Sequence, residues 1–389
     1  MTRIYMDHVA GTPLLPEALS AMLPFLREKF GNPSSIHGFG EEAETALNEA
    51  REKVAALIGA EPDEIVFTSC GTESNNMAFK GVPFAARAKG NHIVTSPIEH
   101  FSIMHGVKAM ERDGFDVTQV AVNEYGMVDP AEVERAIGDK TVLVSIQHAN
   151  PEVGTVQPIG ELGEICRRRK VPFHTDAVDT AGILPLNVKE LKVDLLSLAA
   201  NMFYGPKGAA ALFVRKGVKV QPLLDGGIQE RGKRAGTENV PAIVGMGVAA
   251  EVAAREMAAR RERLLPLGRK LLAGLRERIP HLLVFGHPEE RLPGNVSVGA
   301  RFVEGESILL FLDMAGVAIA SGSACISRSL KVSHVMLAMG IDHGDAQGSL
   351  LFTLGKDNSE ADVDLVLEAL PPIVQRLRDM SPLYKRKSG

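Results

Sequence analysis

The chain has 389 residues, of which 45% are hydrophobic and 23% are charged, and its formal net charge is −5. This composition is typical of a soluble globular protein with room for two domains. The mild acidity gives no reason to expect nucleic-acid binding, and the basic residues 385–387 are expected to be a solvated tail. The three cysteines, Cys70, Cys166 and Cys325, lie far apart, so neither a disulfide framework nor a CxxC metal site is indicated.

No charged and then apolar leader begins the sequence, and we expect a cytoplasmic protein. The longest weakly polar run covers residues 240–254. It is interrupted by Glu251 and rich in Gly and Ala, so it predicts a packed helix and no membrane span.

Short apolar runs alternate with amphipathic stretches through the first two-thirds of the chain. The expected strands are residues 64–69, 92–95, 117–122, 141–147, 172–176, 195–198 and 210–214. The expected helices between them are residues 41–58, 73–87, 131–137 and 159–169. Strands that alternate with helices predict an α/β fold with a mostly parallel sheet.

A long charged amphipathic segment, residues 242–279, leads into a second region that we expect to be a smaller α+β domain. The expected division is a large domain of residues 15–260 and a small domain of residues 1–14 and 261–389. In a mostly parallel sheet, a ligand site belongs at the carboxyl ends of the strands.

One segment at such an end, residues 68–75, reads T-S-C-G-T-E-S-N. It follows an expected strand and opens an expected helix. The small residues around Gly71 would let backbone N–H groups approach a phosphate, assisted by the helix dipole and the Thr72 hydroxyl. The alternative is an ordinary N-capped turn from strand to helix.

Three more polar side chains follow expected strands: His100, Asn150 and Asp176. An imidazole such as His100 could stack on an aromatic cofactor or be a satisfied core histidine. Asn150 offers an amide at a strand end. The carboxylate of Asp176 could pair with a protonated pyridine nitrogen or cap a helix.

A further segment, residues 197–208, reads S-L-A-A-N-M-F-Y-G-P-K-G. Together with the segments above and with residues 5–13, 31–37, 231–239 and 320–325, it closely resembles cysteine desulfurases of the NifS/IscS type. These belong to the fold-type I, class V aminotransferase-like enzymes that use pyridoxal phosphate (PLP). The resemblance covers almost the whole chain and implies their fold.

The resemblance also implies roles for particular residues. His100 would stack on the PLP ring, Asp176 would pair with the ring nitrogen, and Asn150 would approach the ring and the substrate carboxylate. The phosphate would be held by Gly71 and Thr72, joined by Thr237 from the second subunit of a homodimer. Cys325, on a Gly/Ser-rich loop, would attack the sulfur of cysteine and carry a persulfide.

The departures from the family pattern concentrate at the cofactor. Met202 stands where the family has the lysine that holds PLP as a Schiff base. Asp179 stands at a glutamine position, where a carboxylate would repel the phenolate oxygen of PLP. Leu351 stands where an arginine would grip the substrate carboxylate. The remaining departures are Gly11, Cys70, Ala199 and Asn201.

These departures predict that covalent PLP is absent and that normal desulfurase activity is lost. Cys325 keeps its small-residue loop and could carry sulfur or ligate an iron–sulfur cluster, although a buried free cysteine is the commoner fate of a lone Cys. The first hypothesis is therefore a partner in iron–sulfur cluster assembly that presents Cys325 to a scaffold protein, either as a sulfur carrier or as a ligand of a shared iron–sulfur cluster. The alternative is a cysteine desulfurase that binds PLP non-covalently and turns over slowly.

Overall fold

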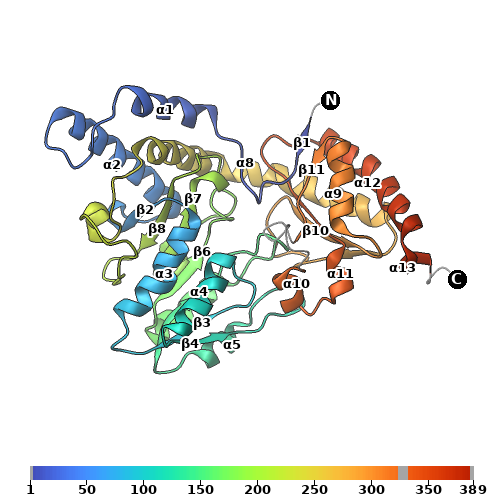
Figure 1. Ribbon diagram of the computed structural model, residues 1–389, viewed down its shortest axis with the longest axis horizontal. Coiled ribbons are helices and arrows are strands. Elements are labelled where there is room, and N and C mark those ends of the chain that lie inside the picture. Colours follow the sequence, from blue (N-terminus) through green and yellow to red (C-terminus); the bar gives the residue numbers. More distant parts are fainter. Residues whose placement is uncertain (1–2, 323–331, 386–389) are drawn as a thin grey trace.

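The computed structural model describes residues 3–322 and 332–385. The chain forms two lobes, and the long helix α8 (Val240–Arg278) extends from one into the other (Figure 1). Cys325, the thiol singled out from the sequence, lies outside the described residues.

The large lobe is built on a sheet with the strand order β2-β8-β7-β6-β5-β3-β4. Its strands are β2 (Ile65–Thr68), β3 (His92–Thr95), β4 (Asp116–Gln119), β5 (Thr141–Ser145), β6 (Phe173–Asp176), β7 (Leu195–Ala199) and β8 (Ala210–Val214). Strand β8 runs antiparallel to β2 and β7, and the other pairings in this sheet are parallel. The expected mostly parallel α/β fold is therefore confirmed.

Helices cover both faces of this sheet, as strands that are apolar on both sides require. One core packs side chains of α2 (Gly38–Ile58), α6 (Ile159–Arg169) and the start of α8 against the strands. The other packs α3 (Gly71–Ala85) and α4 (Phe101–Arg112). The remaining helical elements of this lobe are α1 (Pro16–Arg27), η1 (Pro62–Glu64), α5 (Pro130–Ala136), α7 (Val188–Leu191), η2 (Ala200–Met202) and η3 (Gln229–Gly232).

The small lobe contains the antiparallel sheet β12-β10-β9 and the parallel pair β1-β11. Its strands are β1 (Ile4–Tyr5), β9 (Leu282–Val284), β10 (Asn295–Ala300), β11 (Val317–Ala318) and β12 (Ser349–Thr353). Its helices are α9 (Gly305–Met314), α10 (His334–Ala338), α11 (His343–Gln347), α12 (Glu360–Met380) and α13 (Pro382–Lys385).

Helix α8 belongs to both lobes because its composition changes along its length. Its first half packs closely on α2, where a β-carbon on Gly247 would lie 2.7 Å from the α-carbon of Ala50. Its second half places Leu264, Leu267 and Leu271 in the core of the small lobe. The division at residues 14/15 and 260/261 stays a prediction, with α8 running through its second boundary.

Candidate functional site

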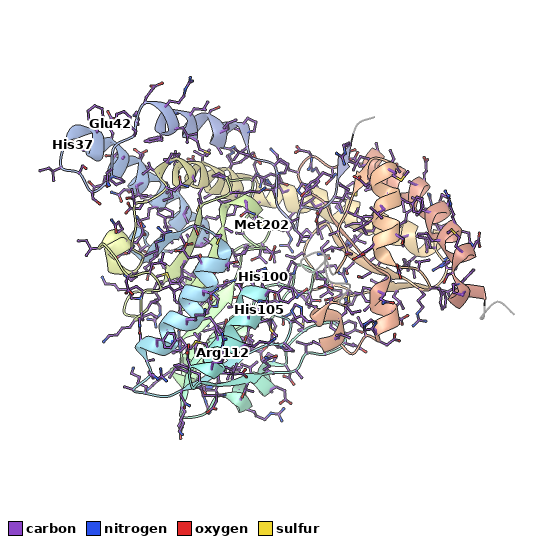
Figure 2. All side chains as sticks on the ribbon, viewed as in Figure 1. His37, Glu42, His100, His105, Arg112 and Met202 are labelled. Carbon is purple, nitrogen blue, oxygen red and sulfur yellow. The ribbon has the colours of Figure 1, made fainter. Side chains whose placement is uncertain are left out.

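The carboxyl ends of β2, β3, β5, β6 and β7 meet on the side of the large lobe that faces the small lobe. Figure 2 shows Met202 and His100 there, in the middle of the molecule. The side chains predicted from the sequence at these strand ends are therefore brought to one region, as the topology of a parallel sheet requires.

The turn before α3 has the geometry of an anion-binding site. Gly71 begins the helix, and Cys70 caps it without a side-chain hydrogen bond. A β-carbon on Gly71 would lie 2.8 Å from Cγ2 of Val178, so only glycine allows this close approach. The first N–H groups of α3 have no partner within the helix and are available to an anion.

Arg234 ties a distant loop to this turn. Its Nε donates to Oε1 of Glu73 over 2.8 Å, and Oε2 of Glu73 accepts from N and Oγ of Ser69. Thr237 lies three positions further along the loop of Arg234 and is exposed. Its predicted role in the site of a second subunit stays a prediction, because a single chain is described.

Asp176, at the end of β6, is buried and hydrogen-bonded at both carboxyl oxygens. Asn75 Nδ2 donates to Oδ2 over 2.5 Å, and the backbone N–H of Val178 donates to Oδ1 over 3.0 Å. Burial raises the pKa of Asp176, while the nearby His100 acts in the opposite direction. The carboxyl group is thus fixed in orientation and suited to receive a proton from a ligand nitrogen.

A hydrogen-bond chain connects Asp176 to His100. Asn75 Nδ2 also donates to Ser102 Oγ over 2.9 Å, and Ser102 Oγ lies 2.8 Å from Nδ1 of His100. The backbone N–H of Ser102 donates to the same Nδ1, so this nitrogen is an acceptor and the proton of the neutral ring is on Nε2. The chain fixes the ring plane of His100 at the beginning of α4.

Asn150 is buried and its amide group is engaged by the loop that carries it. Its Nδ2 donates to the carbonyl of Ile98 over 3.0 Å, and its Oδ1 accepts from the N–H groups of Glu152 and Val153. One Nδ2 hydrogen remains for a ligand. Asn150 therefore uses most of its amide to hold the loop in shape and keeps one hydrogen that can contact a ligand.

Met202 ends the short helix η2 and lines a cavity between the lobes. Asp179 and Lys356 line the same cavity. The Met202 sulfur lies 3.4 Å from Nδ2 of Asn201, and the carbonyl of Asn201 accepts from both N and Oγ1 of Thr12. The Lys356 ammonium lies over the ring of Tyr204, 5.3 Å from its centroid. The thioether thus has a defined place in a packed turn.

The structure changes what was expected of Asp179. Burial and the neighbouring Asp176 raise the pKa of Asp179 to about 8. At pH 7 this carboxyl group is mostly protonated, so it can donate an O–H hydrogen bond as an amide would. The expectation that it repels an oxyanion assumed an ionised carboxylate, and the raised pKa favours the neutral form instead; the effect of Asp179 on a bound oxyanion stays a prediction.

Leu351, in β12, is buried and lines a second cavity, which we call the Leu351 pocket. Two further glutamates, Glu99 and Glu152, line this pocket with His100 and Asn150. Burial raises the pKa of each glutamate to about 8. Within residues 3–322 and 332–385, no lysine or arginine lines the pocket. An amino-acid carboxylate in this pocket therefore finds no lysine or arginine partner among these residues.

Sequence reasoning did not single out the groups that hold the site together. Asn75 and Ser102 orient Asp176 and His100. Glu99 stands beside His100 in the chain, and its Oε1 accepts from Ser96 Oγ over 2.6 Å and from the N–H of Gln147. The sequence offered one signal for these residues, their positions close to predicted site residues. Their burial depends on the tertiary structure and could not be read from the sequence.

Two negative findings apply to the described part of the chain. No group of three or more His, Cys, Asp or Glu side chains there is arranged to hold a metal ion. None of the helices found there combines the length and the apolar character needed to cross a bilayer.

Comparison with known proteins now identifies the family. The family model described as aminotransferase class V matches residues 4–366. A cysteine desulfurase IscS of Methanosarcina thermophila is 52% identical over 384 residues, covering 99% of this chain and 95% of that protein. A cysteine desulfurase IscS of Dictyoglomus turgidum is 50% identical over 384 residues, covering 99% and 97%.

A solved structure described as a NifS-like protein superposes with a TM-score of 0.91 at 38% identity, covering 97% of this chain and 100% of that one. The fold predicted from the resemblance is thereby confirmed. The chain belongs to the class V aminotransferase family and is similar throughout to its cysteine desulfurases.

Proposed function

We propose that this protein works in iron–sulfur cluster assembly without covalently held PLP and presents Cys325 to a scaffold protein. Cys325 would act as a sulfur carrier or as a ligand of a cluster shared with the scaffold. We further propose a cytoplasmic homodimer that brings Thr237 of each subunit to the site of the other. The observation that carries the proposal is Met202, a thioether held in a packed turn where the family has its reactive amine.

The residues at this site do not fit covalent PLP. At the aldehyde end Met202 has no amine and Lys207 of the following turn is exposed, while the Lys356 ammonium, which lines the same cavity, lies over the ring of Tyr204. At the phosphate end Ala199 has no hydroxyl to donate. The ring-binding residues His100 and Asp176 and the anion-binding turn at Gly71 are present. We therefore derive no chemical step through PLP in this protein.

Sulfur handling by Cys325 needs no organic cofactor. A thiolate can take a sulfane sulfur from the persulfide of a donor protein: the new S–S bond forms as the old one breaks, and the donor leaves as a thiolate. No oxidant is consumed. A cysteine thiolate can equally ligate iron while cysteines of the scaffold complete the ligand set.

The second candidate is a slow cysteine desulfurase with non-covalently bound PLP. Two observations favour it: hydrogen bonds connect His100, Ser102, Asn75 and Asp176, and the pKa of Asp179, raised to about 8, favours a neutral carboxyl group that can donate. The Leu351 pocket counts against it, because the substrate carboxylate would lose a charge-assisted pair with arginine, worth a few kcal/mol.

One experiment separates the two candidates. The purified protein is incubated with PLP, reduced with borohydride and analysed by mass spectrometry, and sulfide release from cysteine is measured in parallel. We expect no covalent PLP and no sulfide above background. A covalent adduct, for example on Lys356, or sulfide release that is lost in Cys325→Ser would overturn the proposal.

The positive arm mixes the protein with a scaffold protein, ferrous iron and either sulfide or a persulfide donor. We expect iron–sulfur absorbance or transfer of labelled sulfur that depends on Cys325. Cys166→Ser serves as the matched control, because Cys166 is buried, with 1% of its surface exposed. Equal activity in wild type and Cys325→Ser would refute the role of this thiol.

A further inference from the structure

The cavity that Met202 lines, which we call the Met202 cavity, combines an apolar wall with cationic groups. Its aliphatic side chains come from both lobes and from the helix between them: Ile183 of the large lobe, Leu264 of α8, and Leu292 and Leu354 of the small lobe. The three leucines are buried. We propose that the Met202 cavity binds a short-chain aliphatic carboxylate, with the hydrocarbon chain against these side chains.

Two cations on this cavity have no carboxylate partner among the described residues. The Lys356 ammonium lies over the ring of Tyr204, and Arg261 lines the same cavity and is exposed. A third cation, Arg260, is already paired with Glu256 over 2.7 Å. The cavity therefore carries an excess of positive charge, and a carboxylate ligand would make a charge-assisted hydrogen bond there.

The Lys356 position is fixed by contacts with the large lobe. Its backbone N–H donates to the hydroxyl oxygen of Tyr204 over 2.7 Å, and the N–H of Tyr204 donates to Oγ1 of Thr12 over 2.7 Å. Tyr204 has a φ of 70°, in the left-handed region that is unfavourable for a residue with a side chain. Strained residues of this kind cluster at ligand sites, and the fixed turn places the cation before a ligand arrives.

Asp179 adds a hydrogen-bond donor to the cavity. No described group hydrogen-bonds to its carboxyl, and burial and Asp176 raise its pKa to about 8. Below pH 8 the carboxyl group therefore keeps an O–H that an acceptor in the cavity can receive. An alcohol would accept this bond but gain nothing from the cations, and an alkylammonium ion would be repelled by them.

The test uses hexanoate as the probe, with 1-hexanol and hexylammonium as ligands of the same chain length. Binding is measured by calorimetry and by the NMR signals of labelled methionine methyl groups, each assigned by its loss on replacement with leucine. We expect hexanoate to bind at pH 7 and to shift the signal of Met202. The signal of Met336, which is buried in another cluster, should not move. Hexanol should bind at least about tenfold more weakly, and hexylammonium should not bind.

Two variants test the polar contacts. Lys356→Met keeps the aliphatic part of the side chain and should weaken hexanoate binding by at least about fivefold. Lys189→Met removes a lysine that is exposed and paired with Glu61, and it should leave the affinity unchanged. Asp179→Asn keeps a donor that cannot ionise. The affinity of wild type should fall about tenfold from pH 7 to pH 9 as Asp179 loses its proton, and that of Asp179→Asn should not.

No other described group lining the cavity accounts for such a change. The titratable or charged residues there besides Asp179 are His8, Tyr204, Arg260, Arg261 and Lys356. Burial lowers the pKa of His8 to about 4 and raises that of Tyr204, so both stay neutral between pH 7 and pH 9.

Four results would overturn the inference. They are an unmoved Met202 signal at millimolar hexanoate, hexylammonium binding as tight as that of hexanoate, an unchanged affinity in Lys356→Met, and an equal pH dependence in wild type and Asp179→Asn. Neither Cys325 nor sulfur transfer enters the measurement, so failure of the proposed function would leave this result unaffected.

Discussion

Two glutamates of the Leu351 pocket, Glu99 and Glu152, each keep one carboxyl oxygen without a hydrogen-bond partner in the described chain. Glu99 is only 1% exposed, and burial raises its pKa to about 8. The pKa of Glu99 is therefore higher in the folded protein than in the unfolded chain, so at intermediate pH the folded state binds a proton that the unfolded state releases. The protein should therefore lose stability as pH rises from about 5 to about 8.

This gives a prediction for Glu99→Gln. The amide keeps the oxygen that accepts from Ser96 and Gln147 but cannot ionise. Each unit of pKa difference corresponds to about 1.4 kcal/mol. The free energy of unfolding of the variant, relative to that of wild type, should therefore rise by a few kcal/mol between pH 5 and pH 8. Urea unfolding at fixed protein concentration at four pH values across this range measures the difference.

The exposed Glu161→Gln is the control and should show a difference that does not vary with pH. A difference between Glu99→Gln and wild type that is likewise constant would contradict the prediction. The stability of Glu99→Gln should still fall to some extent as pH rises, because the pKa values of Glu152 and Asp179 are also raised.

At the scale of elements, a buried ion pair holds the loop of Thr237 on the large lobe. Arg51 of α2 makes two hydrogen bonds of 2.8 Å to Glu230 of η3, and its guanidinium lies 4.6 Å from the ring centroid of Phe67. Glu230 has a φ of 48°, in the left-handed region that is unfavourable for a residue with a side chain. The ion pair offsets the cost of this backbone conformation.

Replacing one partner should therefore be costly. Arg51→Met leaves the carboxylate of Glu230 buried without its cation, and we expect a loss of about 3–5 kcal/mol in urea unfolding. The double variant Arg51→Met/Glu230→Met should recover part of this loss. Lys53→Met removes the exposed pair with Glu251 from the same helix and should cost at most about 1 kcal/mol. Equal costs for the two single variants would refute the role of the buried pair.

The same scale shows how far the sequence predicts this structure. The strands β3 and β8 and the helix α6 have the bounds expected from apolar runs and periodicity. Helix α4 was not predicted. Its N-cap is His100, a residue type that is not a usual cap, and here its ring accepts from the N–H of Ser102.

The candidate site was predicted in outline because strand ends and family motifs are local in sequence. What could not be predicted is the protonation of its carboxyl groups. The raised pKa of Asp179 depends on burial and on Asp176, which only the folded chain brings together. The contacts of Glu152 with Gly322 and Ser333 likewise join residues far apart in sequence.

At the scale of the whole molecule, the positions interpreted from the sequence as departures from the family pattern lie on separate elements that meet only in the folded chain. Met202 ends η2 after β7, Asp179 follows β6, and Leu351 is in β12 of the other lobe. Restoring a single residue therefore changes one part of a site whose other parts remain altered. Under the proposed function, desulfurase activity should therefore appear only when residues in both lobes are changed.

The last prediction follows from this distribution. Under the proposed function, Met202→Lys supplies an amine at the position expected for the Schiff base and should bind PLP covalently, as a shift in absorbance would show. Its sulfide release should stay at least about tenfold below that of Met202→Lys/Leu351→Arg, because a charge-assisted bidentate pair contributes roughly 1.5–3 kcal/mol to carboxylate binding. In the double variant the introduced guanidinium would also lie in a pocket lined by Glu99 and Glu152, whose carboxyl groups could ionise beside it. Leu351→Arg alone should release no sulfide, and full activity in Met202→Lys alone would show that Leu351 does not limit this site.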